Sequence, residues 1–443
     1  MKDEKTSRQE RRRRRLRNQF FAYLILIVII VLVLAAGFFG ARFVIHYVND
    51  YNEKVNKVIE EAESGAAAEQ DSEPNSYIEE MPESSAEEVE GYTPPVDEDP
   101  LNTLVESLLS NMTIEEMVAG MFVVSPESIT GVGTAVQAGE GTKTAITENP
   151  IGGLVYTPKN FQSQEQFTEM LTNTRNYAKY PIFMIVSAEC GTTDYGLEET
   201  EKASKLAAAD SVSQSGAAEP PAFDNVSQAY GQIASGLAAY GINMNLAPVA
   251  EIVPTDGDAS FRERSFGSDA HIVCGGVEAA VQAVQGAGVS AVLQKFPYIE
   301  TGSGTLEELQ NNEFLVYNAA IVNGVDCIMV SHVKAESVTG DDTPCSLSPV
   351  MIGDVLRNTL GYNGIVMTDY LDDSAITERY SSAEAAVAAV QAGADLLLSP
   401  ENYQEAYEGV LQAVADGTIT QERIHDAIYR IYCVKHKNAI ESS

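Results

Sequence analysis

Residues 364–369 read Gly-Ile-Val-Met-Thr-Asp, a short apolar and β-branched run that ends on a carboxylate. Similar runs recur along the chain, at residues 121–124, 153–156, 182–187, 243–246, 291–294, 327–330 and 396–398. Strands that are apolar at nearly every position are buried on both faces, which is typical of a parallel sheet. The pattern therefore predicts a parallel sheet built from these runs.

Helical patterns lie between several of the runs and indicate how the strands connect. Ala-rich stretches suited to helices occupy residues 227–240, 271–286, 349–360 and 383–392, and a capping box beginning at Thr113 opens an earlier helix. Repeated alternation of strand and helix predicts an α/β fold, a (β/α)8 TIM-type barrel. The alternative is an open doubly wound sheet, which expects a glycine-rich dinucleotide loop after its first strand. No G-x-G-x-x-G occurs there.

Composition narrows the possible partners. The 443 residues include 28 Lys+Arg and 64 Asp+Glu, a formal net charge of −36 at pH 7. Such acidity argues against nucleic acid, because phosphate binding needs a basic surface. The five cysteines form no C-x-x-C pair, and no cluster has metal-ligand spacing. We therefore expect free thiols, no metal and no cofactor.

The N-terminal region has the pattern of a membrane anchor. Residues 1–19 are basic, and residues 20–41 carry no charge. Those 22 residues would form a helix about 33 Å long, enough to cross a hydrocarbon core of roughly 30 Å. The alternative is a cleaved signal peptide, but the apolar run continues past its best cleavage site at residues 35–37. The basic flank predicts a single-pass plasma-membrane protein with a cytoplasmic N-terminal tail.

An acidic segment separates this span from the barrel. Residues 60–100 contain no Lys or Arg and are rich in Glu, Ser, Ala and Pro. Such a composition buries too little apolar surface to offset the entropy of ordering. We predict a disordered linker over 42–100 and an extracellular barrel domain over 101–443.

Several segments, taken in order, resemble glycoside hydrolase family 3, in its single-domain β-N-acetylhexosaminidase branch. The matching motifs are residues 111–116 (Asn-Met-Thr-Ile-Glu-Glu), 241–249 (Gly-Ile-Asn-Met-Asn-Leu-Ala-Pro-Val), 264–267 (Arg-Ser-Phe-Gly), 329–332 (Met-Val-Ser-His), 356–357 (Leu-Arg), 364–369, 392–395 (Ala-Gly-Ala-Asp) and 423–424 (Arg-Ile). The resemblance implies a TIM barrel that hydrolyses terminal amino sugars of glycans by a retaining mechanism. Cell-wall fragments would be the natural substrates of such an extracellular enzyme.

The resemblance also assigns roles to individual residues. Asp369 occupies the position of the family's nucleophile, and its alternative role is to cap the following helix. Arg264 matches a substrate-binding arginine, with a structural salt bridge to Glu251 as the alternative. His332 matches a strand-end histidine of the family, which would bind substrate or support a residue that does.

Other positions depart from the family pattern. Where the family has Lys-His before its Phe-Pro, this chain has Gln294 and Lys295, and Ser187 replaces a sugar-binding Asp. The loop histidine that donates a proton in the family is absent, and Glu300 is the remaining carboxylate before the next helix. We expect Gln294, Lys295 and Ser187 to line the substrate pocket, and Glu300 is a speculative acid/base.

Two function classes follow from this incomplete site. The first is a membrane-anchored glycosidase whose activity is impaired. The second is a catalytically inactive barrel that binds glycan or an envelope partner. A carboxylate close to Asp369 in an open pocket would favour hydrolysis, because retaining glycosidases place two carboxyl groups about 5–5.5 Å apart.

Overall fold

The computed structural model describes residues 99–191, 193–212, 222–298 and 304–441. The predicted transmembrane helix at 20–41, almost all of the predicted linker, and Glu300 lie outside these residues. Within the described ranges, no helix combines the length and the apolar character that crossing a membrane would require.

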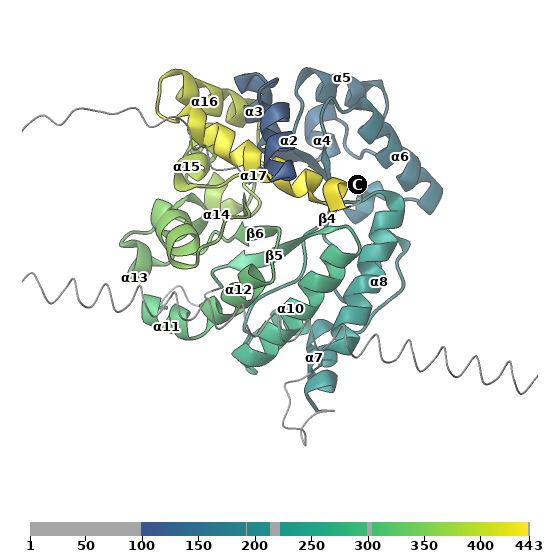
Figure 1. Ribbon diagram of the computed structural model, residues 1–443, viewed down its shortest axis with the longest axis vertical. Coiled ribbons are helices and arrows are strands. Elements are labelled where there is room, and N and C mark those ends of the chain that lie inside the picture. Colours follow the sequence, from purple (N-terminus) through teal and green to yellow (C-terminus); the bar gives the residue numbers. More distant parts are fainter. Residues whose placement is uncertain (1–98, 192, 213–221, 299–303, 442–443) are drawn as a thin grey trace, which may run out of the picture. The chain divides into compact units, whose positions relative to one another are not determined.

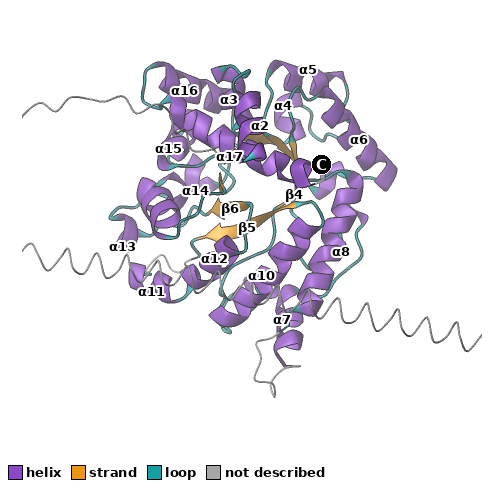
Figure 2. Ribbon diagram, viewed as in Figure 1, coloured by secondary structure: helices purple, strands orange, loops and turns teal. Residues whose placement is uncertain are grey.

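Eight parallel strands form the centre of the structure (Figure 2). They are β1 (Phe122–Val124), β2 (Gly153–Val155), β3 (Phe183–Val186), β4 (Met244–Asn245), β5 (Ser290–Phe296), β6 (Cys327–Val330), β7 (Ile365–Thr368) and β8 (Leu397–Leu398). Each strand pairs in parallel with the next one along the chain from β1 to β7, and β8 pairs with β1. A parallel bridge from Met367 to Leu396 joins β7 to the start of β8. The sheet is therefore a closed barrel, which confirms the predicted fold and excludes the open doubly wound sheet.

Helices connect the strands and cover the outside of the barrel (Figure 1). They are α2 (Pro100–Leu109), α3 (Ile114–Gly120), α4 (Pro126–Thr130), α5 (Glu140–Glu148), α6 (Gln164–Tyr177), α7 (Ala203–Val212), α8 (Asp224–Tyr240), α9 (Ala259–Arg264), α10 (Ala270–Gly286), α11 (Leu306–Asn311), α12 (Glu313–Val322), α13 (Glu336–Thr339), α14 (Ser374–Thr377), α15 (Ser382–Ala392), α16 (Tyr403–Ala415) and α17 (Gln421–Glu441). A π-helix, η4 (Val350–Thr359), follows β6. The four predicted helices at 227–240, 271–286, 349–360 and 383–392 correspond to α8, α10, η4 and α15.

Local sequence signals set the ends of these helices. Thr113 and Glu116 form the predicted capping box, in which each side chain accepts a hydrogen bond from the other residue's backbone N–H. At the other end of a helix, Gly241 terminates α8 with φ of 96°, a conformation that glycine adopts without steric cost. The turn at Gly241 leads the chain directly into β4, whose carboxyl end faces the candidate site.

The C-terminal helix α17 lies across the amino ends of several strands. The Lys435 ammonium donates hydrogen bonds to the carbonyls of Gly152 and Pro181, directly before β2 and β3. Lys437 pairs with Asp326, the residue before β6. The same helix packs against α2, and the Tyr429 hydroxyl donates to Asn102 Oδ1 at 2.6 Å (Figure 1). Helix α17 therefore closes the base of the barrel, opposite the carboxyl ends of the strands.

A buried ion cluster also holds the base together. Asp395 is 0% exposed and directly precedes the run that ends in β8. Its carboxylate contacts Arg357 at 2.6 Å and Arg423 and Arg430 at 3.2 Å each. It also accepts a hydrogen bond from the Val366 N–H at 3.0 Å. One carboxylate thus joins η4, β7 and α17, elements that are distant in the sequence.

Candidate active site

A cavity of about 430 Å³ lies at the carboxyl ends of β4, β5, β6 and β7. Its lining includes Glu251, Arg264, Lys295 and Asp369. Asp369 and Arg264 therefore share one cavity at the end of the barrel where the strand pattern placed the chemistry. Glu251 and Arg264 lie in the connection between β4 and α10, Lys295 lies on β5, and Asp369 follows β7, so the closed sheet brings the charged groups together.

Asp369 is fixed at the end of β7 by backbone and side-chain contacts. Its N–H donates to the Val330 carbonyl at 2.9 Å, which extends the pairing with β6 by one residue. Its Oδ1 accepts from the Tyr370 N–H at 3.0 Å, and its Oδ2 lies 2.7 Å from the Lys295 ammonium. The following helix α14 is capped instead by Asp373, which accepts from the Ala375 N–H. Asp369 is thus a cavity carboxylate and not a helix cap.

The neighbouring residues Gln294 and Lys295 on β5 have different positions. Lys295 lines the cavity, and its ammonium group pairs with the Asp369 carboxylate. Gln294 is buried, and its amide donates to the Leu246 carbonyl beside β4. Gln294 is not among the described residues that line the cavity.

Arg264 makes a bidentate ion pair, but with a different partner from the one weighed from the sequence. Its Nε and one terminal nitrogen donate to the two oxygens of Glu189, at 2.7 and 2.8 Å. The salt bridge is with Glu189 and not with Glu251, because the end of α9 brings the guanidinium against the loop after β3. The Glu189 hydrogen bonds raise the pKa of Arg264. The guanidinium remains part of the cavity wall, 36% exposed.

Glu251 is a carboxylate whose importance the sequence analysis missed. It follows β4, lines the cavity, and is 3% exposed. Its Oε2 is buried without a hydrogen-bond partner among the described residues. Burial raises the pKa of Glu251 to about 7, against the opposing charges of Arg264 and Lys295. Its place in the segment that follows a barrel strand was the sequence signal for a reactive group.

His332 lines the cavity, but its ring nitrogens are engaged within the protein. Nε2 lies 2.8 Å from the Tyr370 carbonyl, which can only accept, so Nε2 carries the proton. Nδ1 then accepts from the Ser346 hydroxyl at 2.7 Å. His332 therefore holds the segment next to Asp369. Ser187 is exposed at the end of β3, and it is not among the described residues that line the cavity.

Two aromatic rings stand together in the cavity wall. Phe261 on α9 and Tyr298 after β5 have ring centroids 6.2 Å apart and planes inclined at 48°. Phe261 is 38% exposed, which is unusual for a large apolar side chain in this domain. Sequence reasoning missed both rings. Phe261 lies on a short helix inside a loop and Tyr298 lies in the loop after β5, so no strand or helix periodicity indicates where either side chain points.

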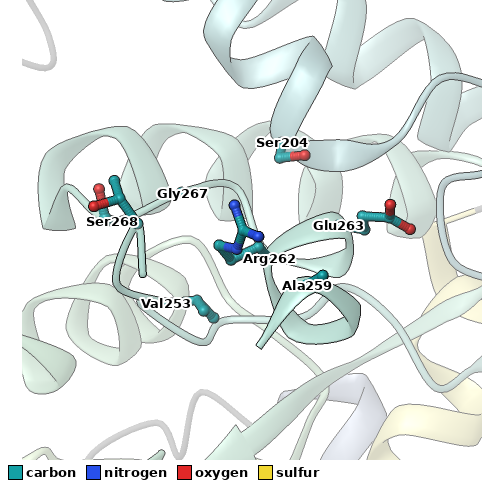
Figure 3. A pocket seen from close by; sticks show the side chains of 8 residues that line it. Ser204, Val253, Ala259, Arg262, Glu263, Gly267 and Ser268 are labelled. Carbon is teal, nitrogen blue, oxygen red and sulfur yellow. The ribbon is translucent and has the colours of Figure 1, made fainter. Parts of the chain in front are cut away.

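A second, smaller depression lies beside α9 and is separate in its lining from the cavity. It has a volume of about 320 Å³ and is lined by residues that include Ser204, Arg262 and Glu263 (Figure 3). Glu263 is exposed and pairs loosely with Lys202 at 3.9 Å. Glu263 provides an acidic side chain close to the cavity that takes no part in its lining.

Comparison with known proteins places this barrel in a family. The family model described as glycosyl hydrolase family 3 N terminal domain matches residues 113–434. A beta-hexosaminidase of Xanthomonas oryzae pv. oryzae is 29% identical over 283 residues, which cover 60% of this chain and 81% of that protein. A beta-N-acetylglucosaminidase/beta-glucosidase of Cellulomonas fimi is 27% identical over 290 residues, and the match spans 60% of this chain but 49% of its own length.

A solved structure agrees with these sequence matches. The family 3 beta-N-acetylglucosaminidase of a Paenibacillus species superposes with a TM-score of 0.64 and 28% identity. The superposition covers 75% of this chain and 64% of that one, so the relative is the longer protein. The family model covers the closed barrel from the capping box at Thr113 into α17, and the chain belongs to glycosyl hydrolase family 3.

Proposed function

We propose that this protein is a retaining β-N-acetylhexosaminidase that removes terminal amino sugars from cell-wall glycans. The observation that carries the proposal is the Asp369 carboxylate, held at the end of β7 and paired with Lys295 in a cavity of about 430 Å³. A cavity of that size accommodates a small ligand. The proposed substrate class follows that of the related beta-hexosaminidases.

Each cavity group has a role in this reaction. Asp369 attacks the anomeric carbon and forms a glycosyl-enzyme intermediate that water then hydrolyses. Lys295 and Arg264 offer N–H donors to sugar hydroxyls or to the acetamido oxygen. The rings of Phe261 and Tyr298 provide an apolar surface for the face of a sugar ring, and the negatively polarised face of each ring favours contact with its C–H groups. His332 orients the segment that follows Asp369.

The family's loop histidine is absent, which lowers the expected rate on natural glycans. General acid catalysis contributes about 10²–10⁴-fold, so a site in which no other group replaces that histidine should turn over unactivated substrates more slowly than family members that retain it. An activated aryl glycoside, whose leaving group needs no proton, should lose much less.

The test is hydrolysis of a dinitrophenyl and a nitrophenyl β-N-acetylglucosaminide, followed by NMR of the first-formed sugar. We expect measurable release from both, faster for the dinitrophenyl substrate, with the β-anomer formed first. An α-anomer would contradict the retaining mechanism. Binding of N-acetylglucosamine without any release would support the inactive glycan-binding barrel instead.

We further propose that residues 20–41 anchor the protein in the plasma membrane, with the barrel outside. The support is the uncharged run of 22 residues behind a basic flank. Deleting residues 1–41 should move the protein from the membrane pellet to the soluble fraction, with the barrel still folded by circular dichroism. Recovery of the intact full-length chain in the soluble fraction would argue against the anchor.

A further inference from the structure

One buried carboxyl group in the cavity has an oxygen that no described residue of the fold hydrogen-bonds. Glu251 is 3% exposed, and its Oε2 has no hydrogen-bond partner among the described residues. Buried polar groups are nearly always paired, since leaving one unpaired costs about 1–3 kcal/mol. Asp395 and Asp326 are two buried acids that show the contrast, because Asp395 meets arginines and Asp326 meets Lys437. Glu251 Oε2, buried and without a partner among the described residues of this cavity, is available to a ligand.

We propose that Glu251 is the proton donor and acceptor of this site, in place of the histidine that the family carries on its loop. The inference rests on the proposed glycosidase function and assigns its missing step. Glu251 and Asp369 follow β4 and β7 and line the same cavity, and a retaining glycosidase uses two carboxyl groups around one scissile bond. Glu251 lies two residues past Val249, which forms a parallel bridge to Gln294 of β5, so the backbone next to this donor is tied to the barrel.

The two half-reactions balance with water as the only co-reactant. In the first, Asp369 forms a bond to the anomeric carbon while the glycosidic C–O bond breaks, and the Glu251 carboxyl proton passes to the leaving oxygen. In the second, the Glu251 carboxylate takes a proton from water, the water oxygen bonds to the anomeric carbon, and the bond to Asp369 breaks. Glu251 ends protonated and Asp369 ends ionised, as both began.

The surroundings of Glu251 suit a group that must gain and lose a proton near neutral pH. Burial raises its pKa to about 7, and the like charges of Glu189 and Asp369 act in the same direction. Arg264 and Lys295 oppose this rise, but each is paired with one of those two acids. From the outer layer, Tyr317 on α12 adds only a neutral phenol, whose pKa burial raises further.

The decisive experiment compares Glu251→Gln with the wild-type full chain on two substrates. For a β-N-acetylglucosaminyl disaccharide, kcat/KM should fall about 10²–10⁴-fold, because an amide cannot donate the proton. For the dinitrophenyl glycoside, kcat/KM should stay within about tenfold, since that leaving group departs as an anion. Azide, which attacks without a general base, should raise kcat of the variant and yield a β-glycosyl azide.

The pH profile gives a second readout that a purely structural role would not produce. The wild-type kcat/KM for the disaccharide should fall as pH rises through about 7, because Glu251 must be protonated in the free enzyme. In Glu251→Gln this decline should disappear. Glu263→Gln is the matched control, since Glu263 lines the separate depression, and it should keep wild-type rates on both substrates.

The possible results separate this inference from the proposed function. An unchanged disaccharide rate in Glu251→Gln, or an equal loss on both substrates without azide rescue, overturns the role of Glu251 and leaves the glycosidase function standing. A selective loss on the disaccharide in Glu300→Gln instead would give the role to Glu300. A wild-type chain that cleaves neither substrate overturns the proposed function and this inference with it.

Discussion

Replacing Asp369 with Asn should lower kcat/KM for every glycoside substrate, activated or not, by more than about 10³-fold, or about 4 kcal/mol of transition-state stabilisation. An amide cannot form the glycosyl-enzyme bond, so no choice of leaving group can compensate. The loss should therefore be equal on the dinitrophenyl glycoside and on a disaccharide, unlike the selective loss expected for Glu251→Gln. Initial rates on both substrates measure the effect.

Asp372→Asn is the matched control for this prediction. Asp372 lies three positions further along the same loop, is exposed, and accepts a hydrogen bond from Ser399. It is not among the described residues that line the cavity, so its variant should retain wild-type rates. Retention of more than about a tenth of the activity in a folded Asp369→Asn protein would show that another group attacks the sugar.

Replacing Asp395 with Asn should destabilise the barrel by about 3–5 kcal/mol, because three guanidinium groups would remain at the base without their shared counter-charge. Asp395 is 0% exposed, so water cannot take over its role. The backbone N–H of Val366 would also lose a charged acceptor. Urea denaturation of the variant and the wild type at equal pH measures the difference in the free energy of unfolding.

Asp342 provides the comparison for an exposed ion pair. Its carboxylate lies 3.3 Å from Lys334 and 3.1 Å from Arg379, but the side chain is 55% exposed. Solvent screens such pairs, so Asp342→Asn should leave the urea midpoint almost unchanged. Equal destabilisation by the two substitutions would mean that burial does not set the strength of the Asp395 cluster.

The barrel could be predicted from the sequence because its strands are apolar at nearly every position. All eight predicted runs overlap an observed strand, and the run at 327–330 matches β6 without any shift. Strand ends were less certain. β5 continues to Phe296, two residues past the predicted end. The prediction stopped too early because Lys295 is polar, although in the structure its side chain lines the cavity. Local apolarity thus indicates where a strand is buried but not where its pairing stops.

Only those residues of the candidate site that lie at the end of a strand could be predicted from the sequence. Asp369 directly follows β7, Lys295 is the last residue but one of β5, and both line the cavity. The partner of Arg264 depends on how the loop carrying α9 folds back over β3, and that packing is not encoded in any local pattern. Glu251 was visible as a strand-end carboxylate. Its lack of a partner becomes apparent only once the surrounding side chains are placed.

The helix that closes the base of the barrel affects how the protein is made. Within this domain α17 is the last element to be synthesised, and it supplies Arg423 and Arg430 to Asp395, and Lys437 to Asp326. Until α17 has been made, Asp326 lacks Lys437 and Asp395 keeps Arg357 but lacks Arg423 and Arg430, so the barrel cannot gain its full stability. Stable folding of this domain is therefore a late event in translation. A nascent chain that stops before α17 leaves the base of the barrel uncovered, with the buried charge of Asp326 unbalanced there.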